Sequence, residues 1–370
     1  MIASQKNSEK SLTMMCKGVS EMNSLQRIQN AVTHKKTDVV PVAPYMGNHA
    51  AFVSGMKLYD YYTNGRKMFE AQARAWELYQ QDVIVLQSDN YYIAEGFGTR
   101  VTYYENSTPT LSEPVITSIK DVDKLKVPDP WSDGRMPVYL EAISLASGAY
   151  GREVAIRGCG TGPFSLAGHL LGTQEFLMEI AQLNYDDSNR AAIHELMELT
   201  TEALLRFDIA QLEAGAHIVI CGDSLASADM ISPAMYEEFV LPYEQKLFSS
   251  LRQYTEKHGG YSLLHICGNN TKTLDLIAST GADIFEVDYK VDLRLCRQKM
   301  QGKMCLMGNI NPVTLLLGSP EEVERETMKC IEAMGDCRGF ILGTGCEVAV
   351  ETPKENMLKM IQTARSFKIQ

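Results

Sequence analysis

The segment YSLLHICGNN (residues 261–270) decides the fold, because a short apolar run passes directly into residues that can carry chemistry. Its first half is typical of a buried parallel strand, and its second half contains His265 and Cys267. The stretch GFILGTGCEV (residues 339–348) repeats this pattern and contains Cys346 after the apolar run. In parallel α/β folds, functional residues gather at the carboxyl ends of the strands. Both stretches therefore predict strands that end at one functional face.

Similar runs recur from about residue 38 onward, and longer stretches with helical periodicity lie between them. Several predicted helices begin with a capping hydroxyl before proline, as at Ser232-Pro233, Ser319-Pro320 and Thr352-Pro353. The predicted strands are Val39–Met46, Asp82–Asp89, Val154–Gly160, His217–Ser224, Tyr261–Gly268, Ile284–Tyr289, Lys303–Asn309 and Gly339–Cys346. Eight such units close a TIM (β/α)8 barrel, which we predict for residues 25–370.

Two segments fall outside this repeat. Residues 1–24 are polar and lack a sustained period, so they predict an N-terminal arm. Residues 90–131 follow the second predicted strand and form a long aromatic segment that contains proline. A loop of that length inside a compact barrel predicts an inserted hairpin that acts as a lid.

The composition restricts the classes of partner. Hydrophobic residues make up 45% of the chain and the net charge is −11, which argues against nucleic acid or an anionic membrane and favours a small molecule or another protein. No apolar run is long enough to span a membrane, and the first residues lack a signal-peptide pattern. We therefore expect a cytoplasmic protein whose nine cysteines are reduced thiols or metal ligands.

The pair His265 and Cys267 predicts a metal site. Residues two apart in a strand point to the same side, and in a closed barrel Cys346 can reach the same point above the core. Two thiolates and one imidazole suit zinc, and three protein ligands leave the open position of a catalytic site. The alternative is a hydrogen-bonded barrel histidine with small buried cysteines.

Polar residues at other strand ends are candidates for catalysis. Asp223, Asp288 and Asn309 end three predicted strands, and Glu347 directly follows Cys346. Each could be a fourth metal ligand, could orient His265, or could transfer a proton. Capping or loop hydrogen bonding is the alternative for all four.

The glycine-rich segment GCGTGPF (residues 158–164) follows a predicted strand. Backbone amides at a helix start could hold a phosphate there. The segment lacks a Walker lysine and the GxGxxG spacing, so neither usual phosphate-binding signature supports that role.

Over about residues 24–368 the chain resembles the uroporphyrinogen decarboxylase superfamily, and within it the corrinoid-dependent methyltransferase branch. The stretches that carry the resemblance are GPFSLAGHLLG (162–172), EAGAHIVICGDSLASADMISPAMYEEFVLPYEQKL (213–247), HICGNNTKTLDLIASTGADIFEVDYKVDL (265–293), MGNINPVTLLLGSPEEV (307–323) and GFILGTGCEVAVETPKENMLKMI (339–361). The resemblance implies that His265, Cys267 and Cys346 bind zinc. It also implies methyl transfer to or from the cobalt of a corrinoid carried on a separate partner protein.

The decarboxylases of this superfamily carry an arginine-rich element near the first strand. Here residues 44–50 read PYMGNHA and contain no arginine, so a decarboxylase-like lyase becomes the less favoured class. A non-catalytic binding protein is the third class, and activity lost in a Cys346→Ala variant would argue against it. We expect no corrinoid held by this chain, since it lacks a DxHxxG-type element, and the possibility of a homodimer stays open.

The direction of transfer rests on Glu347. Branch members that methylate coenzyme M tend to have a small or neutral residue after the corresponding cysteine. A carboxylate there would repel a sulfonated acceptor and could protonate a leaving phenolate. We therefore favour demethylation of a methyl ether such as a methoxyarene, with transfer from methylcobamide to a thiol such as coenzyme M, or to tetrahydrofolate, as the alternatives. Aromatic residues of the insertion would suit an aryl ether, although such residues more often pack locally; they are Tyr91, Tyr92, Phe97, Tyr103 and Tyr104.

Overall fold

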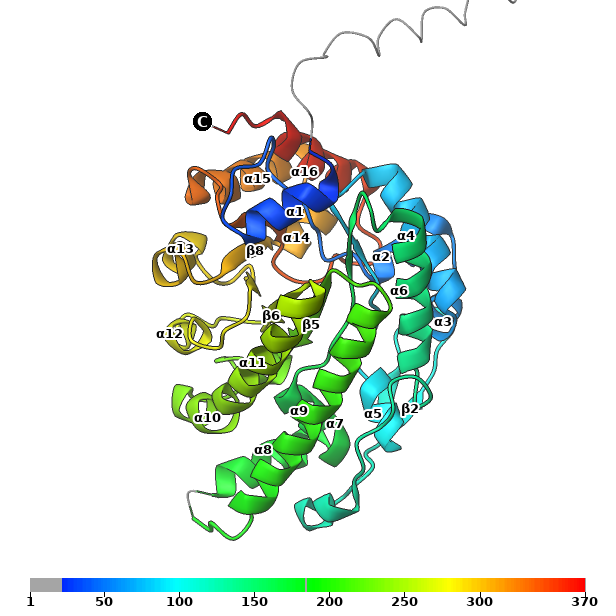
Figure 1. Cartoon of the computed structure of the whole chain (residues 1–370), viewed down its shortest axis with the longest axis vertical. Coiled ribbons are helices and arrows are strands. Elements are labelled where there is room, and N and C mark those ends of the chain that lie inside the picture. The colour runs from blue at the N-terminus through cyan, green and yellow to red at the C-terminus, as the bar shows by residue number, and fades with distance from the viewer. Residues whose placement is uncertain (1–21, 184, 370) are drawn as a thin grey trace, which may run out of the picture.

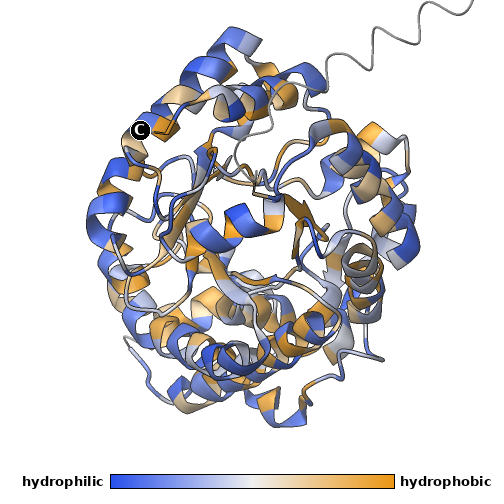
Figure 2. Cartoon of the chain, turned by 45° about the horizontal axis from the view of Figure 1, so that its top comes forward, coloured by the Kyte–Doolittle hydropathy of each residue, from blue (hydrophilic) through white to orange (hydrophobic). Residues whose placement is uncertain are grey.

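The computed structural model describes residues 22–183 and 185–369, and most of the predicted arm lies outside these residues. Its main sheet contains seven parallel strands, whose spatial order follows their order in the chain. They are β1 Val83–Val85, β4 Ala155–Arg157, β5 Ile218–Gly222, β6 Tyr261–His265, β7 Ile284–Glu286, β8 Cys305–Ile310 and β9 Phe340–Thr344. Figure 2 shows the strands at the centre and the helices around them. The TIM-like α/β fold is therefore confirmed.

The first predicted strand, Val39–Met46, is not a regular strand, but it occupies the position between β9 and β1. Val42 forms a single parallel bridge with Leu342. The amide of Ala43 donates to the carbonyl of Leu342 at 2.8 Å, and the carbonyl of Val42 accepts from the amide of Asp82 at 2.8 Å. Pro41 and Pro44 lack an N–H group and interrupt the ladder. The barrel is thus completed by isolated hydrogen bonds at this seam.

The interior of the barrel is closed at its amino end by α1 (Ser24–Val32), which the sequence pattern did not predict as a helix. Its buried residues Ile28, Ala31 and Val32 join the cluster formed by the inward-facing strand residues. Burial of Ile28 and Val32 stabilises this contact by roughly 1.5–3 kcal/mol per side chain. Asn23 and Gln26 form a capping box that fixes where α1 begins. Access to the interior is therefore left at the carboxyl end.

Helices surround the barrel in Figure 1. The helical periodicity of the sequence predicts helices over residues 65–79 and 320–334, and α4 and α15 have these bounds. Ser319 and Ser232 cap their helices as predicted. Thr352 does not cap α16, whose N-cap is Pro353. The periodicity of residues 233–257 predicts one helix, but the structure has two, α10 and α11, with Pro242 in the first turn of α11. The helices are α1, α2 Asn48–Ser54, α3 Leu58–Thr63, α4 Gly65–Tyr79, α5 Tyr92–Phe97, α6 Met136–Tyr150, α7 Pro163–Leu171, α8 Thr173–Gln182, α9 Arg190–Glu213, α10 Pro233–Phe239, α11 Leu241–His258, α12 Leu274–Ile277, α13 Leu293–Met300, α14 Pro312–Leu317, α15 Pro320–Met334 and α16 Lys354–Ser366.

The insertion contains the predicted hairpin, in which β2 (Arg100–Thr102) pairs antiparallel with β3 (Thr110–Glu113). It also contains α5 and the 3-10 helix η1 (Ile119–Lys124). Arg135 ties the insertion to the segment that follows β1, because it donates two hydrogen bonds of 2.7 Å to Asp89 and one of 2.6 Å to Glu95.

The aromatic residues of the insertion pack against neighbouring helices. The ring of Tyr92 lies 4.4 Å from that of Tyr139, and the ring of Tyr103 stacks on Tyr62 at 5.9 Å. Tyr91 packs against His169 with ring centroids 4.7 Å apart. These contacts follow the local-packing alternative, so they give no support to an aromatic wall for an aryl ether.

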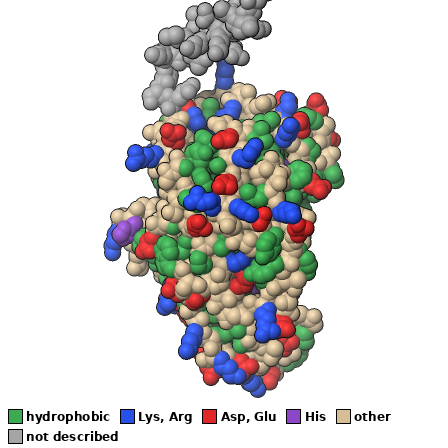
Figure 3. All heavy atoms as spheres, turned by 90° about the vertical axis from the view of Figure 1, so that its right-hand side faces the viewer, with side chains coloured by type: hydrophobic (Ala, Val, Ile, Leu, Met, Phe, Trp, Pro, Cys, Tyr) green, Lys and Arg blue, Asp and Glu red, His purple; other side chains and the backbone are tan. Residues whose placement is uncertain are grey.

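Charged side chains are mixed on the surface. Figure 3 shows the face that forms the right-hand side of Figure 1, where lysines and arginines alternate with acidic and hydrophobic side chains. Such a mixed face offers no single-sign field for a nucleic acid. Within residues 22–183 and 185–369, no helix has the length and apolar character that a membrane crossing requires.

Candidate metal centre

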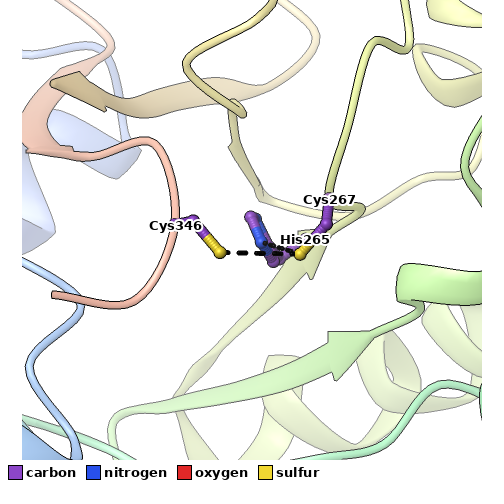
Figure 4. Close-up of side chains that lie close together, drawn as sticks. All are labelled: His265, Cys267 and Cys346. Carbon is purple, nitrogen blue, oxygen red and sulfur yellow. Dashed lines mark hydrogen bonds between the residues drawn. The ribbon is translucent and has the colours of Figure 1, made fainter. Parts of the chain in front are cut away.

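The three predicted metal ligands converge at the carboxyl end of the barrel. His265 ends β6, Cys267 follows two residues later, and Cys346 lies two residues beyond β9. Figure 4 shows Cys346 approaching from the side opposite His265 and Cys267. The Nε2 atom of His265 lies 3.1 Å from the Cys267 sulfur, which is 3.7 Å from the Cys346 sulfur. All three ligand atoms lie within 4.8 Å of one another, a spacing that a metal ion can bridge.

Close packing of two loops sets the position of Cys346. Gly345 directly precedes it, and a Cβ atom at Gly345 would lie 2.2 Å from the backbone nitrogen of Tyr289. Only glycine allows the loop after β9 to approach the loop after β7 this closely. Gly345 therefore allows the close approach of the two loops, and this approach positions the thiol of Cys346.

A buried ion pair lies beneath the cluster. Glu286 in β7 accepts two hydrogen bonds from Arg157 in β4, of 2.7 and 2.9 Å, and both side chains are almost fully buried. The Nδ1 atom of His265 donates to the carbonyl of Glu286 at 3.0 Å and lies 3.5 Å from its carboxylate. The guanidinium also lies over the ring of Tyr45, 4.7 Å from its centroid. Hydrogen bonding at Nδ1 directs Nε2 toward the two thiols.

This ion pair was not among the predicted site residues. The sequence does contain an indication of a buried ion pair. Arg157 and Glu286 are charged residues inside the otherwise apolar runs VAIRG and IFEVD. A charge on a fully buried strand needs a partner. The sequence does not show that these two charges, 129 residues apart, partner each other.

The electrostatics of the cluster favour a thiolate next to an imidazolium. The hydrogen bond from the Cys346 thiol lowers the pKa of Cys267, against the effect of burial, and the neighbouring His265 lowers it further. Burial disfavours a charged His265, but Cys267 and Glu286 outweigh it and raise the pKa of His265 to about 9. The thiolate is the form of cysteine that binds metals, and a lowered pKa favours it.

Asp223 has a different environment from the one predicted. Its carboxylate accepts hydrogen bonds from the backbone amides of Phe164 (3.0 Å) and Ser165 (2.7 Å) and from the Ser165 hydroxyl (2.7 Å). It therefore caps the amino end of α7 from a distant part of the chain. Burial raises the pKa of Asp223 to about 6, although these hydrogen bonds lower it. The contacts match the capping alternative, and a catalytic role for Asp223 stays a prediction.

The same cap explains the glycine-rich segment 158–164. A Cβ atom at Gly162 would lie 2.4 Å from the Asp223 side chain, and one at Gly160 would lie 1.7 Å from the carbonyl oxygen of Ile220. The glycines thus allow close packing against β5 and its following residue. Because Asp223 already occupies the amino end of α7, the segment offers no free amide cradle for a phosphate.

Asp288 and Asn309 brace the loop after β7. Asp288 accepts from the amides of Gly268 (2.7 Å) and Lys290 (2.8 Å), and the side chain of Asn309 donates to the carbonyls of Asp288 (3.1 Å) and Val291 (2.7 Å). Because Gly268 follows Cys267, Asp288 fixes the segment that carries the thiol. Their part in proton transfer stays a prediction.

Glu347 lies at the mouth of the barrel, between α2 and the loop after β9. One carboxylate oxygen accepts from the backbone amide (3.0 Å) and the side-chain amide (2.9 Å) of Asn48. Burial raises the pKa of Glu347 to about 7. None of the four candidates joins the group of His, Cys, Asp and Glu atoms around Cys267 in the described residues, so a fourth protein ligand does not follow from the structure.

The carboxyl end of this TIM-like barrel brings together an imidazole and two thiols, a donor set of the kind that binds zinc in enzymes. The family model for uroporphyrinogen decarboxylase (URO-D) matches residues 23–367. The chain belongs to this family.

Its relatives include methyltransferases and decarboxylases. The chain is 30% identical to the methylcobamide:CoM methyltransferase MtbA of Methanosarcina acetivorans, covering 70% of this chain and 72% of the relative. It is 28% identical to the methylated-thiol–coenzyme M methyltransferase of Methanosarcina mazei, covering 95% and 91%. Uroporphyrinogen decarboxylases are also among the relatives.

A solved structure has the same fold over nearly its whole length. It is described as a methyltransferase from Methanosarcina mazei, with a TM-score of 0.82, 26% identity and coverage of 93% of this chain and 98% of that one. The relatives confirm the expected corrinoid-dependent methyltransferase at the level of the family. The favoured demethylation of an ether is not confirmed, and the thiol alternative fits the named relatives better.

Proposed function

We propose that the chain is a zinc-dependent methyltransferase that moves a methyl group between the corrinoid of a partner protein and a small thiol. The observation that carries the proposal is the convergence of His265, Cys267 and Cys346 at the carboxyl end of the barrel. The sequence alone favoured an ether as the methyl donor. The named relatives, which act on coenzyme M or methylated thiols, reverse that order.

The donor set fits zinc. Two sulfurs and one imidazole nitrogen are ligands that zinc prefers, and the half-buried thiols face the end of the barrel that α1 does not close. Bound there, zinc would supply Lewis acidity that lowers the pKa of an incoming thiol.

The residues of the chain would prepare that site in three ways. Glu286 holds the His265 ring so that Nε2 faces the sulfurs. Asp288 fixes Gly268, and with it the Cys267 segment. Glu347 presents a carboxyl group beside Cys346 that can exchange a proton near neutral pH. A corrinoid on the partner protein would supply the methyl group, and an acceptor thiol that has given up its proton would receive it on sulfur.

A second candidate is demethylation of a methyl ether, and the observation that favours it is Glu347. Burial raises the pKa of Glu347, and a protonated carboxyl group at the mouth could donate its proton to a leaving alkoxide or phenolate. A thiol acceptor does not need such a donor. The two candidates therefore differ in how strongly they depend on the proton of Glu347.

The test measures methyl transfer in both directions. With methylcobalamin as donor and coenzyme M or 2-mercaptoethanol as acceptor, we expect thioether formation that chelation abolishes. The Cys346→Ala variant should lose activity by a factor of at least 100, on the scale seen when a key metal-site group is removed. Cys337→Ala is the matched control, because Cys337 is a buried cysteine outside the cluster.

Three outcomes would contradict the thiol proposal. Methylation of tetrahydrofolate but of no thiol would change the acceptor. Formation of methylcobalamin from a methoxyarene and reduced cobalamin, without any thiol methylation, would establish the demethylase. Decarboxylation of uroporphyrinogen that survives chelation would indicate the lyase.

A further inference from the structure

A second cluster of potential metal ligands lies outside the barrel interior. It consists of Cys221 in β5, Asp223 directly after β5, and Glu244 in α11. One ligand atom from each residue lies within 4.8 Å of the other two, and all three residues are buried. Along β5, Ile218 and Ile220 face the barrel interior, whereas Cys221 belongs to the core between the sheet and the helices. The cluster is therefore separate from the His265 centre.

The two buried carboxyl groups of the cluster, those of Asp223 and Glu244, have no basic side chain as a partner in the described residues. Neither carboxyl group forms an ion pair with an arginine, lysine or histidine in the described residues. The Asp223 carboxylate has only the three donors at the start of α7. Burying a carboxylate costs several kcal/mol unless a counter-charge or full hydrogen bonding compensates it. A positive ion between β5 and α11 would neutralise the buried charge that the donors at the start of α7 leave uncompensated.

Two of the ligand atoms are left without a partner. One oxygen of Glu244 accepts from the hydroxyl of Tyr236, but the other, Oε1, is fully buried and accepts no hydrogen bond. No hydrogen bond to the Cys221 sulfur occurs in the described residues. Asp208 adds a third buried carboxyl group near Cys221, and its Oδ2 atom also lacks a partner. The partnerless oxygen of Glu244 lies beside the Cys221 sulfur and the Asp223 carboxylate, so these atoms are free to act as ligands of one ion.

We propose that Cys221, Asp223 and Glu244 bind a second divalent metal ion, which pins α11 to the carboxyl end of β5. The ligand chemistry restricts the class of ion. Magnesium and calcium take oxygen ligands, whereas one thiolate with two carboxylates suits a borderline ion such as Zn²⁺. Zinc–ligand lengths of about 2.0–2.3 Å require ligand atoms no more than about 4.6 Å apart. The three ligand atoms of this cluster lie within 4.8 Å of one another, so small side-chain adjustments would bring them to that spacing.

The competing account is a proton. Burial, together with the nearby Asp223, raises the pKa of Glu244 well above its usual range. A protonated Glu244 could donate to Asp223 and neutralise the pair, but it would leave the Cys221 sulfur unpartnered. A metal ion would be coordinated by all three residues, whereas a proton shared between Glu244 and Asp223 would involve only two of them. Metal analysis separates the two accounts.

The experiment counts metal ions in the purified full-length chain after it has been loaded with Zn²⁺ and gel-filtered. We expect two ions per chain in the wild type and one in Glu244→Gln, where the isosteric amide removes only the charge. Cys346→Ala should also retain one ion, and the combination with Glu244→Gln should retain none. Glu256→Gln, on the exposed side of α11, is the matched control and should keep both ions.

Thermal unfolding provides the second measurement. In the Cys346→Ala background, added Zn²⁺ should raise the unfolding midpoint, and Glu244→Gln should abolish this rise. If Glu244→Gln fails to fold, Cys221→Ala tests the same ligand set, and Cys305→Ala controls for loss of a buried thiol. A single ion in the wild type that Glu244→Gln leaves in place would overturn the second site. A chain whose ions are unaffected by Cys346→Ala would instead contradict the proposed catalytic centre.

Discussion

Removing Arg157 should destabilise the protein far more than removing an exposed arginine. In an Arg157→Met variant, the Glu286 carboxylate would lose two hydrogen bonds of 2.7 and 2.9 Å and its buried counter-charge. Breaking one partner of such a pair costs about 3–5 kcal/mol, because the remaining charge stays buried. The surface pair Arg206–Glu202 is the control, and Arg206→Met should cost less than about 1 kcal/mol because both side chains are largely exposed.

The double variant Arg157→Met/Glu286→Met distinguishes the charge effect from a packing effect. Removing both partners leaves no isolated charge, so the double variant should regain most of the loss and can equal the wild type. It should nevertheless bind zinc more weakly, because the carboxylate 3.5 Å from the Nδ1 atom of His265 is lost while the hydrogen bond to the backbone carbonyl of residue 286 remains. Thermal unfolding midpoints of the metal-free proteins, compared under identical conditions, give the order of stability.

Two results would refute this reasoning. An Arg157→Met variant as stable as wild type would mean that the Glu286 charge is solvated or neutralised by another group. A double variant no more stable than the single one would mean that Arg157 acts through the volume of its side chain or its contact with the Tyr45 ring. In either case the buried charge would not be the dominant effect.

Three further predictions test other parts of the structure. Gly345→Ala should lower the unfolding midpoint and weaken metal binding, because the added Cβ atom would collide with Tyr289. The control Gly148→Ala lies within α6 with open space around it and should stabilise the protein by about 0.5–1 kcal/mol. Equal effects of the two substitutions would contradict the close approach of the loops. Burial lowers the pKa of His169 to about 4, so the stability of the fold should decrease as the pH falls from about 6.5 toward 4. If the thermal unfolding midpoint of a His169→Gln variant depended on pH in the same way as that of the wild type, His169 would not be the cause. Ser319→Ala should cost about 0.5–2 kcal/mol through the lost cap of α15, and circular dichroism melting without any shift would exclude that role.

The sequence predicts those parts of the fold that depend on local pattern. Apolar runs ending in polar residues mark the strands, and a serine before proline marks the starts of α10 and α15. The ligand trio is predictable because strand parity puts His265 and Cys267 on one side and because barrel closure brings the end of β9 near β6. The first strand is the exception, since its two prolines permit only isolated ladder bonds.

The remaining features depend on contacts between distant parts of the chain. The sequence makes Asp223 a candidate strand-end acid, and a catalytic role stays a prediction. The sequence does not reveal that its carboxylate also caps a helix that begins 60 residues earlier. No local pattern distinguishes the two roles. The partnership of Arg157 with Glu286 and the convergence of Cys221 with Glu244 likewise become visible only when the barrel and its outer helices are assembled.

The plug formed by α1 has a practical consequence for attaching the protein to a surface. Because α1 closes the amino end of the barrel, the chain enters the fold on the side away from His265, Cys267 and Cys346. A tether placed ahead of Ser24 would hold the molecule with its open mouth facing the solution. Immobilised in this orientation, the protein could capture a methylated corrinoid carrier and release it again in flow, which would give the rates of both steps directly.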